Sequence, residues 1–234
     1  MSGDSALVLM CKAPVSGKVK TRLCPPLTPR EAAGLYACLL EDTAAEAVSL
    51  RRLRKFLFHS PPEARGHFLA APFSGFILMD QKGYDLGERM TNAMDAAFSS
   101  GARRVAVIGA DCPALSAGRI RSALRELEDG ADAVFGPAED GGFYLIGLCA
   151  PSPDLLRGIA WSTRTVLAAV ISRCRNAGMA YALLPAELDI DTAESLDELR
   201  RRMRLGPRPA CPRTREWLGI ASRRVSPVTG RITS

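Results

Sequence analysis

The sequence predicts an α/β protein with three layers, α/β/α, around a mainly parallel mixed sheet. Short apolar runs alternate with longer amphipathic stretches, which is the order of βαβ units and therefore of a parallel sheet covered on both faces. The chain has 234 residues, 47% of them hydrophobic and 24% charged, as in a globular domain that can bury a full core. No internal repeat or low-complexity segment contradicts this interpretation.

The first half of the chain begins with a continuous apolar run at 6–10, which is typical of a strand buried on both faces. Further strands are expected over 55–60, 75–80 and 104–111, a short helix between the second and third strands, and longer helices over 28–49 and 88–101. Thr28, Pro29 and Glu31 form a capping box with proline at the first helical position, so the first long helix should begin there. Gly101 ends the second long helix.

In the second half, strands are expected over 131–137, 143–148 and 180–185. Ser116 should cap one helix, Ser162 or Thr163 should start another that ends near Gly178, and Thr192 should cap a last helix that ends near Leu205. Only a tight turn separates the strand at 143–148 from the strand before it. We therefore expect it to run antiparallel to its neighbour.

Composition excludes several classes of protein. Seven scattered cysteines without a C-x-x-C pair, and only two histidines, do not favour a structural zinc site. No apolar run is long enough for a membrane helix, and the N-terminal residues do not read as a signal peptide. We therefore expect a cytoplasmic protein whose thiols are reduced.

The positive charge is concentrated at the C-terminal end. Residues 200–234 contain ten arginines and one acid, so the net charge of +6 comes from this segment alone. We divide the chain into one domain over 1–205 and a partly ordered basic tail over 206–234. Such a tail could touch nucleic acid, but a simple appendage is the favoured interpretation.

The loop after the first strand is unusually rich in lysine. Three of the five lysines of the chain, Lys12, Lys18 and Lys20, lie within nine residues of one another, with Arg22 close behind. Ammonium and guanidinium groups at the carboxyl end of a strand suit phosphate oxygens, and Gly17 permits close backbone approach. The loop matches neither a Walker A loop nor G-x-G-x-x-G. A solvated basic loop is the alternative.

Acids also follow predicted strands. Asp111 stands at the carboxyl end of the strand expected over 104–111, facing the basic loop, where it would be a natural magnesium ligand; a local turn is the alternative. Asp189 and Asp191 lie two apart, so on an extended segment they face the same way. Asp191 could be a metal ligand or could cap the last helix together with Thr192, and Asp189 is the weaker candidate. The turn at 138–142 carries Asp140 and Gly141, a strong hairpin signal.

Five ordered stretches, "KAPVSGKVKTRL", "GADCPALS", "GPAEDGGFYLIGL", "WST" and "LDIDT", resemble a bacterial family of rSAM/selenodomain-associated transferases, or glycosyltransferases of the arsenosugar-biosynthesis type. That family belongs to the nucleotide-diphospho-sugar transferase (GT-A) superfamily, which includes molybdenum-cofactor and 2-phospho-L-lactate guanylyltransferases. The resemblance covers about residues 6–199 and implies a GT-A-like fold. It also implies a Mg²⁺- or Mn²⁺-dependent transferase that acts on a nucleotide or nucleotide-sugar and a small-molecule acceptor.

The resemblance also assigns residues to parts of a site. The nucleotide-binding set would be Lys12, Pro14, Gly17, Lys18, Lys20, Arg22, Gln81 and Arg89, with Lys20, Arg22 and Asp111 catalytic. Asp111 and Asp191 would hold the metal ion. Asp140, Gly141, Gly142, Trp161 and Ser162 would line the acceptor or sugar pocket. For Gln81, Arg89 and Trp161, an ordinary loop, helix start or interior aromatic residue is an equal alternative.

The sequence leaves the reaction open. Glycosyltransferases of this superfamily carry D-x-D at the position where this chain has Asp111, Cys112 and Pro113, which is a single acid. The missing second acid favours nucleotidyl transfer. The family resemblance favours glycosyl transfer. A non-catalytic nucleotide-binding or regulatory module is the alternative from another class. If Asp111 and Asp191 share one ion, their carboxyl groups should lie within about 6–8 Å of each other.

Overall fold

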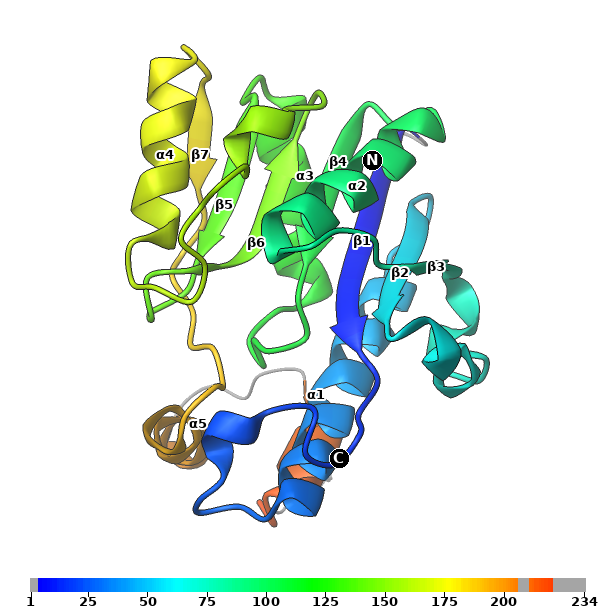
Figure 1. Cartoon of the computed structure of the whole chain (residues 1–234), viewed down its shortest axis with the longest axis vertical. Helices are drawn as coiled ribbons and strands as arrows, with labels where there is room; N and C mark the ends of the chain where they lie inside the picture. Colours follow the sequence, from blue (N-terminus) through cyan, green and yellow to red (C-terminus); the bar gives the residue numbers. More distant parts are fainter. Residues whose placement is uncertain (1–3, 206–210, 221–234) are drawn as a thin grey trace, which may run out of the picture.

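The computed structural model describes residues 4–205 and 211–220. Its centre is a seven-stranded sheet in the order β3-β2-β1-β4-β6-β5-β7 (Figure 1). The strands are Ser5–Lys12 (β1), Arg54–Ser60 (β2), Ile77–Asp80 (β3), Arg104–Ile108 (β4), Ala133–Pro137 (β5), Phe143–Leu148 (β6) and Tyr181–Leu183 (β7). All neighbouring pairs are parallel except those that β6 makes with β4 and β5. The predicted mainly parallel mixed sheet and the antiparallel strand are confirmed.

Six α-helices are described: Pro29–Ser49 (α1), Leu86–Ser99 (α2), Ala117–Glu128 (α3), Val166–Asn176 (α4), Ala193–Leu205 (α5) and Pro212–Trp217 (α6). Short 3₁₀ helices, Pro62–Phe68 (η2) and Phe73–Gly75 (η3), take the place of the short helix expected between β2 and β3. The predicted caps of α1, α3 and α5 are present, because Thr28, Ser116 and Thr192 each accept a backbone hydrogen bond from the residue three positions later.

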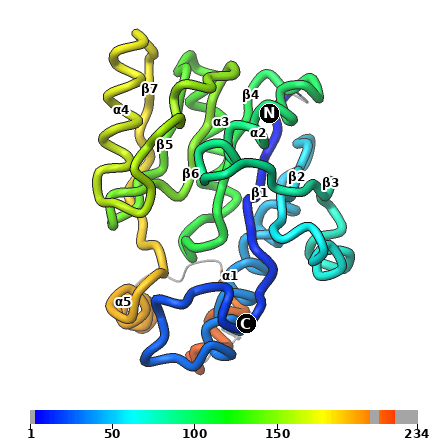
Figure 2. Tube along the Cα trace, viewed as in Figure 1, coloured from blue at the N-terminus to red at the C-terminus, as the bar shows by residue number. Residues whose placement is uncertain are grey.

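The two faces of the sheet have separate cores. Alternate residues of β1 point to opposite faces: Leu7 and Leu9 pack in one cluster with α1 and α3, while Ala6 and Val8 pack in the other with α2 and α4. The three layers of the prediction follow from this alternation. Figure 2 shows the same arrangement as a trace, with β1 near the middle of the sheet.

A third cluster lies beyond the carboxyl ends of the parallel strands, below the sheet in Figure 1. It joins the loop after β1 to α1, α5 and α6 through buried residues that include Leu23, Leu35, Ile190 and Leu199. The 3₁₀ helix η1 (Thr21–Leu23) anchors the lysine loop there. The sheet edge and this third cluster therefore meet where parallel α/β sheets bind ligands.

The segment after residue 205 contributes to this third cluster. Cys211 is buried, and the helix α6 packs on α1. Buried Asp42 on α1 accepts hydrogen bonds from the backbone N–H groups of Arg213 and Thr214, at 3.1 and 2.9 Å, and from the Thr214 hydroxyl at 2.8 Å. Residues 211–220 thus pack against the predicted domain. Most of the predicted tail lies outside the described residues.

The start of α4 was predicted wrongly. The helix begins at Val166 after Thr165, not at Ser162 or Thr163. Ser162 has a φ of 61°, a left-handed conformation that cannot begin a right-handed helix, and the Thr163 hydroxyl donates to the Ala160 carbonyl in a turn. The polar residues that resembled a cap therefore form the turn that precedes the helix. No helix in the described part of the chain is long and apolar enough to cross a membrane.

Candidate active site

A cavity of about 600 Å³ opens at the carboxyl edge of the sheet. Its volume falls in the range of small-molecule sites. Strands β1 and β4, the lysine loop, the start of α2, strand β6 and the segment before α5 all contribute lining residues. Among the predicted site residues, those on the cavity wall are Lys12, Lys18, Lys20, Gln81, Arg89, Asp111, Trp161, Ser162, Asp189 and Asp191.

The side chain of Lys20 is central to this site. Its Nζ lies 2.5 Å from Asp111 Oδ1 and 2.7 Å from Asp191 Oδ1, and the side chain is only 5% exposed. The same Nζ is 6.0 Å from the centroid of the Tyr36 ring, within the range of a cation–π contact. Lys20 therefore points at carboxylates in this structure, although the sequence assigned it to phosphates.

Three aspartates meet at this lysine. One carboxylate oxygen each from Asp111, Asp189 and Asp191 lies within 4.8 Å of the others, which is inside the limit expected for Asp111 and Asp191. The main chain holds them together, because the Ile190 N–H donates to the Asp111 carbonyl at 3.0 Å. This hydrogen bond fixes the position of the segment that carries Asp189 and Asp191 relative to the loop after β4.

The structure bears on the alternative in which Asp191 caps α5. The Thr192 hydroxyl accepts from the Ser195 N–H and caps α5, while the Ser195 hydroxyl accepts from the N–H groups of Asp191 and Thr192. The carboxylate of Asp191 takes no part in the cap and faces Lys20 instead. Arg22, whose side chain is 67% exposed, lies 4.0 Å from the other oxygen of Asp191.

The charges in the cluster shift one another's pKa values. Burial opposes the charge of Lys20, but Asp111, Asp191 and Asp189 more than offset it and raise the pKa of the ammonium. Burial likewise opposes the charge of Asp191, and the positive charges of Lys20 and Arg22 outweigh it, so the pKa of this carboxyl is lowered. Burial and then the charge of Asp111 raise the pKa of Asp189 well above its ordinary value. The negative charges of Asp111 and Asp191 thus surround the ammonium of Lys20, while burial and these charges together disfavour a further negative charge on Asp189.

The other loop residues surround this cluster differently. Lys12 and Lys18 are exposed and line the cavity, so their ammonium groups can reach a ligand there. Gly17 has a φ of 75°, which favours glycine, and Pro14 is half-buried and does not line the cavity. The loop therefore offers two free lysines beside the paired one.

Gln81 and Arg89 are both partly committed to the protein. The amide of Gln81 donates to the carbonyls of Cys11 and Phe58 at 2.8 and 2.9 Å, which ties the ends of β1 and β2 together. Arg89 donates through Nε to the Gly83 carbonyl at 3.0 Å. Both side chains also line the cavity, and their contacts with a nucleotide remain a prediction.

The predicted acceptor residues fall into two groups. Trp161 and Ser162 line the cavity, and the indole of Trp161 packs edge-on against Phe143, with ring centroids 6.3 Å apart. Asp140, Gly141 and Gly142 are not on the cavity wall. Instead, they form the hairpin turn, and Asp140 Oδ1 accepts from the Gly142 N–H at 2.9 Å. The hairpin interpretation of this turn is therefore confirmed, and its contact with an acceptor remains a prediction.

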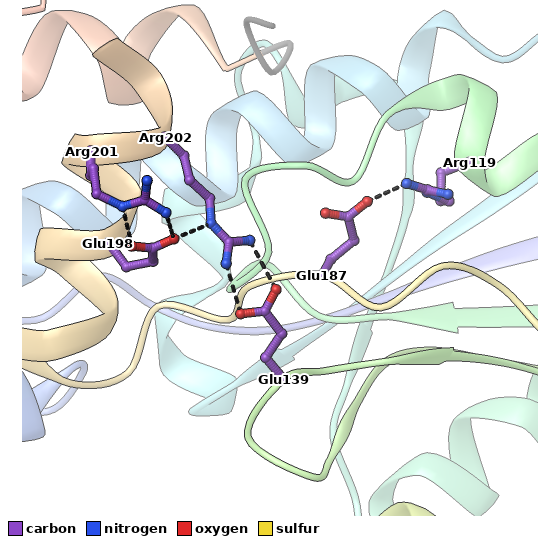
Figure 3. Close-up of polar contacts among 6 residues, drawn as sticks. All are labelled: Arg119, Glu139, Glu187, Glu198, Arg201 and Arg202. Carbon is purple, nitrogen blue, oxygen red and sulfur yellow. Dashed lines mark hydrogen bonds and ion pairs between the residues drawn. The ribbon is translucent and has the colours of Figure 1, made fainter. Parts of the chain in front are cut away.

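An arginine–glutamate network braces the turn and the segment before α5 (Figure 3). Arg202 on α5 holds both carboxylate oxygens of Glu139, each at 2.9 Å, and contacts Glu198 at 2.6 Å. Arg119 on α3 pairs with Glu187. Because Glu187 lies two residues before Asp189, this second ion pair helps to hold the segment that leads into the aspartate cluster.

Sequence reasoning missed or undervalued several lining residues. Asp189 was ranked below Asp191, yet it belongs to the same cluster. Tyr36 lines the cavity and accepts a hydrogen bond from the Lys12 N–H at 3.0 Å. Because Tyr36 lies on the buried face of α1, its sequence context indicates only a residue of the hydrophobic core. Tyr84, which is 97% exposed and lines the cavity, lies between the two candidates Gln81 and Arg89 and was not singled out.

Several known structures have a similar architecture. A candidate nucleotide-diphospho-sugar transferase of Desulfovibrio desulfuricans G20 is 31% identical, with a TM-score of 0.83 over 94% of this chain and 97% of that one. A cytidylyltransferase of Leptospira borgpetersenii is 11% identical, with a TM-score of 0.54 over 93% of each chain. The inositol-1-phosphate CTP transferase of T. maritima is 12% identical, with a TM-score of 0.54 over 95% of this chain and 100% of that one.

The first of these comparisons shows the same fold over nearly the whole chain, and the other two show that the fold is shared at low identity. No curated protein matches the chain. The family model DUF2064, described as an uncharacterized protein conserved in bacteria, matches residues 43–163, which is more than half of the chain. With its mixed sheet built like that of nucleotide-diphospho-sugar transferases, this chain belongs to the DUF2064 family.

Proposed function

We propose that this protein is a transferase that uses a divalent cation, Mg²⁺ or Mn²⁺, and acts on a nucleoside triphosphate or a nucleotide-sugar. One observation carries the proposal: Asp111, Asp189 and Asp191 converge around Lys20 on the wall of a large cavity at the carboxyl edge of the sheet. The candidate nucleotide-diphospho-sugar transferase that is 31% identical supports the same class of substrate.

The residues present fit such a cation. All three groups are carboxylates, the hard oxygen donors that Mg²⁺ and Mn²⁺ prefer, and no histidine or cysteine belongs to the cluster. Asp189 and Asp191 lie beside Asp111 in space, so the site has three carboxyl groups although the motif at Asp111 has only one acid. When bound, the cation would neutralise charge on the phosphates and on the leaving group.

Each part of the cavity then has a role. Lys12 and Lys18 on the cavity wall, and exposed Arg22 beside Asp191, would bind phosphate oxygens, because charge-assisted contacts from a basic loop suit a polyphosphate. Gln81 and Arg89 would contact the nucleoside. Trp161 and Ser162, on the wall formed with β6, would face the acceptor or the sugar.

Two reactions fit one such site. In nucleotidyl transfer, an acceptor oxygen attacks the α-phosphorus of a triphosphate and pyrophosphate leaves. In glycosyl transfer, the acceptor attacks the anomeric carbon of the sugar and a nucleoside diphosphate leaves. The lysine-rich loop favours the first, and the resemblance of the sequence motifs to arsenosugar-type glycosyltransferases favours the second.

The test is a thermal-shift screen of nucleoside triphosphates and nucleotide-sugars, each with and without MgCl₂. Cytidine compounds belong in the screen because two fold neighbours are named for cytidylyl and CTP transfer. A specific ligand should raise Tm by mass action, and Asp111→Asn should abolish the part of the shift that needs Mg²⁺. A screen without any stabilising nucleotide would refute the proposal. With an active pair, release of pyrophosphate or of nucleoside diphosphate identifies the reaction.

A further inference from the structure

Lys20 lies where the oxygen ligands of the proposed cation site converge. Its Nζ is within 2.7 Å of oxygens from both Asp111 and Asp191, and its side chain is almost fully buried. A divalent cation bound to those oxygens would sit about 2.1 Å from each of them. An ammonium at ion-pair distance from the same atoms would then be close to the cation and strongly repelled by it.

We propose that Lys20 is an internal counter-ion that a divalent cation displaces, and that the released ammonium then pairs with the phosphates of the incoming substrate. This inference rests on the proposed function. Lys20 therefore has two sets of partners: Asp111 and Asp191 when the site is empty, and phosphate oxygens when cation and substrate are bound.

The charges around Lys20 explain why it pairs with the acids first. Three carboxyl groups share this small volume, and among the described residues Lys20 and the more distant Arg22 form ion pairs with them. Without Lys20, the carboxylates would repel one another. The pairing therefore stabilises the empty site and gives the carboxylates a fixed spacing before any ligand arrives.

The loop allows Lys20 to change partners. Lys20 has a left-handed backbone conformation, with φ 48° and ψ 36°, immediately before η1. Leu23, three residues later, is buried in the third cluster and anchors the loop there. Lys20 itself lines the cavity beside exposed Lys18. Rotation of its flexible side chain would bring the ammonium to the phosphate side while the core stays packed.

This exchange makes the binding of cation and substrate cooperative. A cation alone must release the ammonium without giving it a new partner, so it should bind weakly. Phosphates supply that partner, so they should raise the affinity for the cation. By thermodynamic linkage, the cation should raise the affinity for phosphates by the same factor.

The experiment titrates Mn²⁺ alone into three proteins: the wild type, Lys20→Met and Lys18→Met. Isothermal titration calorimetry measures the affinity of each protein for Mn²⁺. Methionine keeps an unbranched, flexible side chain of similar length at position 20 and removes the ammonium group. Lys18→Met is the matched control: it removes the same charge from the same loop, and no carboxylate pairs with Lys18 in the described residues. We expect Lys20→Met to bind Mn²⁺ about tenfold or more tightly than wild type, within the usual range of such couplings, and Lys18→Met to resemble wild type.

A second measurement uses the wild type in case Lys20→Met does not fold. With five lysines in the chain, a ¹⁵Nζ NMR spectrum can resolve the Lys20 ammonium, and Mg²⁺ added as its tripolyphosphate complex should shift that signal. If the Lys20 signal does not change while Mg²⁺ binds, or if Lys20→Met binds Mn²⁺ no more tightly than wild type, the inference is wrong and the cation site remains. If no form binds Mn²⁺, with or without tripolyphosphate, the proposed function falls as well.

Discussion

Lys20 and Asp191 lie 171 residues apart in the chain and form an ion pair of 2.7 Å at the carboxyl edge of the sheet. The lysine comes from the loop after β1, and the acid from the segment between β7 and α5. Their contact joins the sheet to the cluster formed by α1, α5 and α6. The candidate site therefore lies at the junction of two separately packed parts of the fold.

The first prediction concerns the two residues at the start of α5. Asp191→Asn should weaken Mg²⁺-dependent nucleotide binding about tenfold or more, because it removes a charged ligand and a partner of Lys20. Thr192→Ala should lower stability by about 1 kcal/mol, because it removes the cap of α5, and should leave nucleotide affinity nearly unchanged. Calorimetry and urea unfolding of both variants check this. The reverse pattern would mean that Asp191 serves the helix and not the ligand.

The second prediction concerns the exposed part of the lysine loop. Lys18→Ala and Arg22→Ala should each weaken nucleotide binding about tenfold, because each removes one charge-assisted phosphate contact. Both should keep the wild-type Tm, since exposed charges contribute little to stability. If neither affinity changes, the loop is only a solvated basic segment, as the alternative interpretation of the sequence has it.

Local sequence signals were sufficient for much of the fold. Alternating apolar runs predicted the strands, and Thr28, Ser116 and Thr192 predicted three helix starts, because a cap is a local interaction of three or four residues. The turn at Asp140 and Gly141 predicted the antiparallel strand for the same reason. Local signals failed at Ser162, where the backbone is left-handed.

The site could be predicted only in part. Asp111 and Asp191 follow apolar runs, and the topology of a parallel sheet brings such positions to one edge. The direction of the Lys20 side chain has no local signal, because it depends on carboxylates far away in the sequence. The packing of residues 211–220 on α1 could not be predicted for a similar reason. It depends on Asp42, which is buried within α1 but has the sequence context of an ordinary polar helix residue.

The third prediction concerns that acid. Asp42→Ala should lower the free energy of unfolding by roughly 3 kcal/mol, because three hydrogen-bond donors lose a buried charged acceptor. Nearby Glu41 pairs with Arg213 at 2.8 Å, but both side chains are about two-fifths exposed, so Glu41→Ala should cost less than about 1 kcal/mol. Chemical unfolding of the two variants measures the contrast. Equal losses would show that α6 does not depend on Asp42.

The fourth prediction concerns the hairpin turn. Gly141 has a φ of 95°, and a Cβ there would lie 2.1 Å from the carbonyl oxygen of Arg164. Gly178 has a φ of 66° with nothing within 4 Å of its Cβ position. Gly178→Ala should therefore cost roughly 1–2 kcal/mol for the left-handed backbone alone. Gly141→Ala should cost about 2 kcal/mol more, because the Arg164 backbone must move. Similar unfolding energies for the two variants would mean that the turn is not packed as described.

The central claim is that the aspartate cluster holds a divalent cation together with a nucleotide. Electron paramagnetic resonance of Mn²⁺, titrated with the nucleoside triphosphate or nucleotide-sugar that stabilises the protein most, counts the ions bound per chain in wild type and in Asp111→Asn. We predict one bound ion per wild-type chain and at least about a tenfold loss of affinity in the variant. Equal stoichiometry and affinity in the two proteins would contradict the claim, because the ion would then be bound elsewhere.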